Sequence, residues 1–170
     1  MNEVLARWNK AAREEAVEEI LSCCGSKAWA EKMANRRPFA SEGSLLFASD
    51  AVWFGSSSLD WLEAFGSHPC IGESAGKASA RAAAEDWSAA EQHHVTAAQA
   101  EIKLALAEGN RAYEQKFGHI FIVCAAGKSA FEILEILRHR MHNEGGAELR
   151  EAAEQQRQIT QLRLRKWLGI

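Results

Sequence analysis

Proline and tyrosine are both scarce in this sequence. The 170 residues contain two prolines and one tyrosine. Few prolines leave long stretches free to form helix, and a β-sandwich normally carries more aromatic and β-branched residues. Alanine, glutamate, leucine and arginine are frequent, and all four are strong helix formers. The composition therefore predicts an all-α protein.

The chain also lacks an excess of charge of one sign. Its formal net charge is −3, and basic residues are mixed with acidic ones along most of its length. Nucleic acids and anionic membranes attract strongly basic surfaces, so neither is predicted as a partner. No apolar stretch is long enough to cross a membrane, and the first residues do not resemble a secretion signal.

Four cysteines occur without the spacing of a metal or redox site. Cys23 and Cys24 are adjacent, whereas Cys70 and Cys124 are isolated, and zinc or thiol–disulfide sites usually contain a Cys-x-x-Cys pair. This usage is typical of a reduced, intracellular chain in which cysteines fill the core. We expect a cytoplasmic protein without a bound metal.

Length and apolar content favour one domain over residues 1–170. Hydrophobic residues make up 47% of the chain, which is enough for a sizeable core. Asn9 is expected to cap the first helix, Gly109 to end the fifth, and the alanine-rich interval 73–86 to form a loop. Apolar spacing and cap residues predict a single-domain bundle of about eight or nine helices, near 9–24, 26–37, 41–54, 59–66, 88–108, 110–117, 129–142 and 147–167.

One apolar run, Phe121-Ile122-Val123-Cys124, has the character of a strand. It is short and has no alternating partner strand, so we expect a buried extended segment near 121–124 and no sheet. Its main-chain N–H and C=O groups would then be free to bind a ligand, because no ladder uses them.

Polar side chains gather at two places. His68 precedes Pro69, and a residue before proline avoids helical backbone, so the imidazole lies on a stiff corner where it can exchange a proton near neutral pH. Further along, Ser88, Glu91 and Gln92 lie at i, i+3 and i+4, on one face of a helix N-terminus. That end of a helix favours anionic groups.

Structural explanations stay open for these residues. Ser88-x-x-Glu91 is also the pattern of a capping box, in which both side chains bond main-chain N–H groups of their own helix. From the residues alone, a structural histidine bonded to nearby main chain is the favoured interpretation of His68. Arg163 differs, because apolar residues four positions away on both sides place its guanidinium within an apolar arc. A buried cation requires a partner.

Taken in order, many short motifs resemble the family of 2-oxo-4-hydroxy-4-carboxy-5-ureidoimidazoline (OHCU) decarboxylases, which make (S)-allantoin late in urate breakdown. The resemblance extends over almost the whole chain. The motifs are Trp8-Asn9, Trp29, Arg37-Pro38-Phe39, His68-Pro69, Ile71-Gly72-Glu73, Ser88-x-x-Glu91-Gln92, Asn110-x-x-Tyr113-x-x-Lys116-Phe117-Gly118, Phe121-Ile122, Glu132-Ile133-Leu134, Arg140, Asn143 and Ile159-x-x-Leu162-Arg163-Leu164.

The resemblance implies a homodimeric enzyme of purine catabolism that releases CO₂ from the ureidoimidazoline without a cofactor. It implies His68 and Glu91 as catalytic residues. The residues expected to bind the substrate are Pro69, Ser88, Gln92, Phe121, Ile122, Val123, Cys124, Ala125 and Arg163. Two other functions stay open: a hydrolase of a related cyclic ureide, which would release no CO₂, and a non-catalytic helical interaction module.

Overall fold

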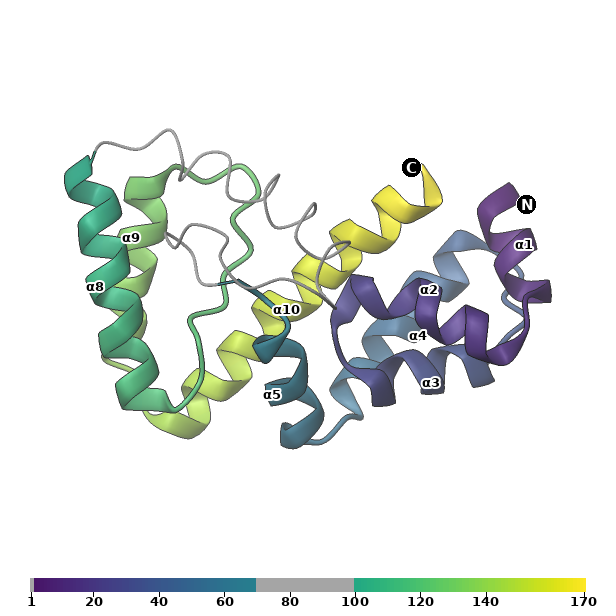
Figure 1. Cartoon of the computed structure of the whole chain (residues 1–170), viewed down its shortest axis with the longest axis horizontal. Coiled ribbons are helices and arrows are strands. Elements are labelled where there is room, and N and C mark those ends of the chain that lie inside the picture. The colour runs from purple at the N-terminus through teal and green to yellow at the C-terminus, as the bar shows by residue number, and fades with distance from the viewer. Residues whose placement is uncertain (1, 70–99) are drawn as a thin grey trace. The chain divides into compact units, whose positions relative to one another are not determined.

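The fold is built from helices. A computed structural model describes residues 2–69 and 100–170, and within these residues it contains eight helices and no strand. The helices are α1 Glu3–Lys10, α2 Arg13–Cys24, α3 Lys27–Asn35, α4 Glu42–Phe54, α5 Ser58–Gly66, α8 Ala100–Phe117, α9 Ala130–Arg140 and α10 Gly145–Leu168 (Figure 1). The prediction of an all-α protein is confirmed. The loop expected at 73–86 and the helix start expected at Ser88 lie outside the described residues.

The chain divides into two compact units. The first comprises Met1–Ala64 and Arg157–Ile170, and the second comprises Phe65–Gln156. The single domain expected over 1–170 stays a prediction. None of the helices in the described ranges combines the length and the apolar content that crossing a bilayer requires.

Local cap signals predicted several helix ends correctly. The Ser26 hydroxyl accepts a hydrogen bond from the Trp29 N–H at 3.3 Å and begins α3. Ser129 and Glu132 form a capping box at the start of α9, where the sequence predicts a helix to begin. Gly25 ends α2 with φ 87°, a left-handed conformation that glycine adopts without a steric penalty.

Asn9 connects segments of the first unit and does not start a helix. Its Nδ2 donates to the Phe39 carbonyl oxygen at 2.9 Å, and its Oδ1 accepts from the Phe39 N–H at 3.0 Å. The predicted N-cap role is wrong, because Asn9 lies inside α1 and α2 begins without a side-chain cap. Nearby, the Arg37 guanidinium lies 5.2 Å from the Trp8 ring centroid. These motif residues therefore stabilise the first unit.

Gly109 lies inside a helix, so the helix end expected there is wrong. α8 runs without a break from Ala100 to Phe117. A Cβ atom added at Gly109 would lie 2.6 Å from Cδ2 of Leu137 in α9. The glycine thus permits close approach of the two helices, and this packing outweighs its poor helix propensity.

The core of the second unit includes the segment that the sequence predicts to be extended. Two of that segment's residues, Phe121 and Val123, are buried with side chains of α8 and α9. Phe131 of α9 is 57% exposed and does not belong to this core. The buried cluster consists of Leu106, Tyr113, Phe121, Val123, Ala125, Ala130, Ile133, Leu134 and Leu137.

We expect Gly109→Ala to lower the free energy of unfolding by about 1–3 kcal/mol, because the added methyl group overpacks the contact with Leu137. Helix propensity alone would favour alanine by about 1 kcal/mol, so the sign of the change decides between the two effects. Urea unfolding followed by circular dichroism measures it. Gly146→Ala is the matched control, since a Cβ there would meet only Arg150 Nη1 at 3.9 Å. A Gly109→Ala protein as stable as the control would contradict the packing argument.

Candidate active site

His68 lies just after α5, at the corner that the His-Pro pair predicts. Its main-chain N–H donates to the Phe65 carbonyl oxygen at 3.1 Å, and this bond closes the end of the helix. His68 and Pro69 are both half-buried. The corner is therefore held by its main chain while its side chains are not fully enclosed.

An aromatic cluster connects the helix end before His68 with the extended segment. Ring centroids are 5.3 Å apart for Phe65 and His119, 5.5 Å for His119 and Tyr113, and 5.2 Å for Tyr113 and Phe121. Tilted and edge-to-face pairs at these separations are favourable beyond the apolar area they bury. The corner and the extended segment thus share one buried support within the second unit.

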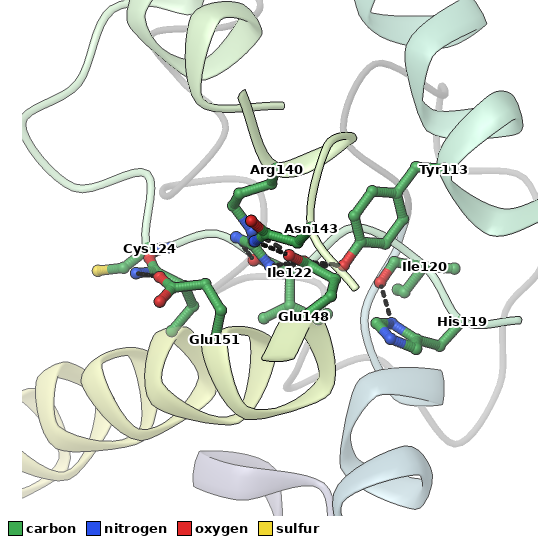
Figure 2. Close-up of polar contacts among 10 residues, drawn as sticks. Tyr113, His119, Ile120, Ile122, Cys124, Arg140, Asn143, Glu148 and Glu151 are labelled. Carbon is green, nitrogen blue, oxygen red and sulfur yellow. Dashed lines mark hydrogen bonds and ion pairs between the residues drawn. The ribbon is translucent and has the colours of Figure 1, made fainter. Parts of the chain in front are cut away.

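The segment 121–125 is buried and is bonded through alternate residues. Each of its residues is 6% exposed or less. Arg140 Nη1 donates to the Ile122 carbonyl oxygen at 2.7 Å (Figure 2). The Cys124 N–H donates to Gln155 Oε1 at 2.9 Å. The prediction that this main chain is free for a ligand is therefore wrong for the Ile122 carbonyl and for Cys124.

Phe121 and Val123 differ from their neighbours. Within the described ranges, no hydrogen bond reaches the main-chain groups of either residue. In an extended chain, successive residues present their main-chain polar groups to opposite sides. The bonds at Ile122 and Cys124 therefore use one edge of the segment, and no group within residues 2–69 and 100–170 bonds the other edge at Phe121 and Val123.

A buried ion pair that the sequence reasoning missed holds the Ile122 carbonyl. Arg140 is 3% exposed and Glu148 is 0% exposed, and Arg140 Nε donates to Glu148 Oε1 at 2.8 Å. The Tyr113 hydroxyl donates to the same carboxylate oxygen, and Asn143 Nδ2 donates to the other at 2.7 Å (Figure 2). Burial, together with the hydrogen bond to Glu148, raises the pKa of Tyr113, so its hydroxyl remains a donor.

Arg163 belongs to the first unit and is 1% exposed, which confirms that its side chain lies within the apolar arc of α10. Its Nη1 donates to the Ser22 carbonyl oxygen at 3.5 Å. Its charge also acts on the thiols of Cys23 and Cys24. Burial raises the pKa of both thiols to about 12, although the Arg163 charge lowers it. The guanidinium therefore interacts with the Ser22 carbonyl and with the two buried thiols, all within the first unit.

We expect Cys23 and Cys24 to be inert to thiol reagents in the folded protein at pH 8. With a pKa of about 12, only about one thiol in 10⁴ is ionised at that pH, and the thiolate is the reactive form. Because the folded-state pKa lies above the ordinary 9.0, the neutral thiols stabilise the fold below pH 9, and this contribution is lost as the pH rises toward 12. Labelling of a Cys70→Ser/Cys124→Ser variant with Ellman's reagent, folded and in urea, checks the expectation. Rapid labelling of the folded variant would contradict it.

The predicted site residues fall in three groups. They are His68, Pro69 and 121–125 in the second unit, Arg163 in the first unit, and Ser88, Glu91 and Gln92 outside the described residues. A pocket that joins the catalytic pair with Arg163 therefore stays a prediction. Across residues 2–69 and 100–170, no cluster of three or more His, Cys, Asp or Glu side chains could hold a metal ion.

Comparison with known proteins identifies the family. A model of the OHCU decarboxylase family matches residues 9–165. The chain belongs to this family. This OHCU decarboxylase family member is 38% identical over 161 residues to the uric acid degradation bifunctional protein TTL of Arabidopsis thaliana, and the match covers 91% of the chain and 48% of that relative. The chain thus spans about half the length of the curated relative it matches.

Two solved structures resemble this family member. A crystal structure of OHCU decarboxylase in the presence of (S)-allantoin is 34% identical, with a TM-score of 0.78 over 90% of this chain and 99% of the other. A crystal structure of (S)-allantoin synthase shares the fold at 19% identity, with a TM-score of 0.64 over 96% of this chain and 53% of the other. The family that the sequence motifs predicted is confirmed.

Proposed function

We propose that this chain decarboxylates OHCU to (S)-allantoin and CO₂ in the breakdown of urate. The family match over residues 9–165 carries the proposal. Two relatives support the substrate class: the Arabidopsis thaliana protein named for uric acid degradation and the OHCU decarboxylase crystallised in the presence of (S)-allantoin. The proposal concerns this chain alone, which matches 48% of the length of the Arabidopsis thaliana relative.

The proposed reaction breaks the bond between a ring carbon and its carboxylate. CO₂ leaves, and the electron pair that remains on carbon delocalises into the adjacent imine and carbonyl groups of the substrate. Since the substrate acts as its own electron sink, the proposed step uses no cofactor. The protein has to orient the carboxylate, place donors where negative charge develops, and deliver a proton to one face of the carbanion.

In this proposal His68 delivers the proton and Glu91 supports it. The half-buried corner, held by the bond between the His68 N–H and Phe65, suits a proton donor that has to reach a ligand. Glu91 accepts hydrogen bonds from ring or ureido N–H groups and orients His68. The main-chain groups of Phe121 and Val123, which no other described residue bonds, offer donors and acceptors for the planar ring.

The remaining residues are proposed to bind the substrate's oxygens. Arg163 is the counter-ion of an anionic group, because a guanidinium binds carboxylates in a fixed planar geometry. Pro69 keeps the corner rigid. Ser88, Gln92 and Ala125 complete the proposed wall of the site, together with the side chains of Ile122 and Cys124.

The proposal also includes a homodimer, a cytoplasmic location and a single domain over 1–170. The resemblance implies the dimer. Among the described residues, Cys23, Cys24 and Cys124 are buried and form no disulfide, a usage typical of a reducing compartment.

A stereochemical assay tests the proposed function. The unstable ureidoimidazoline is generated from urate with the two preceding enzymes of the pathway, this protein is added, and allantoin is followed by circular dichroism together with CO₂ release. A fast rise of one enantiomer with an equal amount of CO₂ is the expected result. Allantoin formed no faster than the spontaneous racemic product would overturn the proposal, and ureide consumed without CO₂ would indicate the hydrolase instead.

A further inference from the structure

The Arg140 guanidinium contacts a carboxylate, a main-chain carbonyl and an aromatic ring at once. Its Nε donates to Glu148 Oε1 at 2.8 Å, and its Nη1 donates to the Ile122 carbonyl oxygen at 2.7 Å. Its guanidinium also lies 4.8 Å from the centroid of the Phe121 ring. Because the five N–H donors of arginine have a rigid planar arrangement, the carboxylate fixes the orientation in which the carbonyl is bonded.

The bonds at one oxygen of Glu148 fix how its carboxylate meets Arg140. Arg140 and the Tyr113 hydroxyl both donate to Oε1, whereas Asn143 donates to Oε2 and does not contact Arg140 through this bond. Buried hydrogen bonds of this kind strengthen one another and favour one geometry of the Arg140 guanidinium. A buried ion pair is often no more stabilising than apolar residues of similar size, so stability alone does not account for an Arg–Glu pair at this place.

The bonded carbonyl lies in the segment proposed to bind the substrate. A second anchor holds the same edge two residues further on, where Gln155 accepts from the Cys124 N–H and donates to Glu151 Oε1 at 3.0 Å. Together the anchors determine the orientation of the opposite edge, where no described residue bonds the main chain of Phe121 or Val123.

We propose that Arg140 is a positioning residue for the decarboxylation. Paired with Glu148, it holds the Ile122 carbonyl so that the main-chain groups of Phe121 and Val123 meet the substrate in one fixed geometry. The inference rests on the proposed function. The same aromatic cluster that contacts Arg140 through Phe121 and Tyr113 extends to Phe65, so the wall and the His68 corner pack on one buried support.

Three variants test the inference. Arg140→Lys keeps the charge beside Glu148, but a single ammonium nitrogen cannot reproduce the fork that bonds carboxylate and carbonyl together. The apolar triple variant, Tyr113→Phe/Arg140→Met/Glu148→Leu, removes the ion pair while filling its volume, so that it folds without the anchor. Asn143→Ala is the control, because it removes one bond to Glu148 and leaves the bond to Ile122.

Steady-state kinetics are measured well below the melting temperature of each variant, with hydrogen exchange of the segment 119–126 recorded without ligand. We expect Arg140→Lys and the apolar triple variant to lose on the order of 10²-fold in kcat/KM, the cost of a displaced binding wall, and to exchange faster in the segment. Asn143→Ala should stay within about threefold of the unmodified protein, since the contact that sets the geometry is intact.

Two results would overturn the inference. One is an apolar triple variant that is folded and as active as the unmodified protein. The other is a loss of activity that follows thermal stability alike in Arg140→Lys and Asn143→Ala. Failure of the proposed function looks different, because the unmodified protein itself would then form allantoin no faster than the background.

Discussion

Replacing His68 with asparagine is expected to lower kcat for OHCU decarboxylation by about 10²–10⁴-fold, the usual contribution of a positioned proton donor. Asparagine has a similar size and polarity but no titratable proton. The fold should be unaffected, because the bond that closes α5 comes from the main-chain N–H of His68 and is kept in the variant. Circular dichroism of the allantoin formed gives both the rate and the enantiomer.

The control for this variant is His139→Asn, which changes an exposed histidine of α9. It should turn over like the unmodified protein. Any allantoin that His68→Asn still forms should be closer to racemic, because solvent can protonate the carbanion on both faces. Near-normal turnover with retained stereochemistry would exclude His68 as the proton donor.

Helix ends were predictable from the sequence where a local interaction decides them. The hydroxyl of Ser26 and the capping box of Ser129 and Glu132 bond main-chain groups three residues away, so the pattern carries the whole cause. Gly109 has the same local appearance as a stop, yet it lies inside α8. Its role depends on Leu137, which a local pattern cannot reveal.

The candidate site shows the same division. The burial of Arg163 was predictable from its apolar neighbours along α10, and the burial of Arg140 could have been, since Ile133 and Leu137 share its face of α9. The sequence around Glu148 contains no pattern that predicts its burial. Glu148 lies in the first turn of α10, where an acidic residue usually interacts with the helix N-terminus. Only the tertiary structure shows that it binds Arg140 and that the pair anchors the Ile122 carbonyl.

The buried charge of Arg140 depends on the Glu148 carboxylate, and removing that carboxylate gives the largest expected change in stability. Glu148→Ala should lower the free energy of unfolding by about 3–5 kcal/mol, because it leaves the Arg140 charge buried without its carboxylate. Tyr113 and Asn143 lose their acceptor in the same substitution. Urea unfolding followed by far-ultraviolet circular dichroism measures the difference.

The matched control is Glu135→Ala, which breaks the bond between Arg138 Nη1 and Glu135 Oε1 at 2.8 Å, an ion pair whose side chains are 61% and 51% exposed. Water already solvates both groups there, so the expected loss is at most about 0.5 kcal/mol. A Glu148→Ala protein no less stable than this control would mean that the buried pair contributes little to the fold. The apolar triple variant completes the comparison. The loss of stability in Glu148→Ala is attributed to the Arg140 charge that stays buried without a partner. The triple variant also removes that charge and the Tyr113 hydroxyl, so its free energy of unfolding should lie within about 2 kcal/mol of that of the unmodified protein.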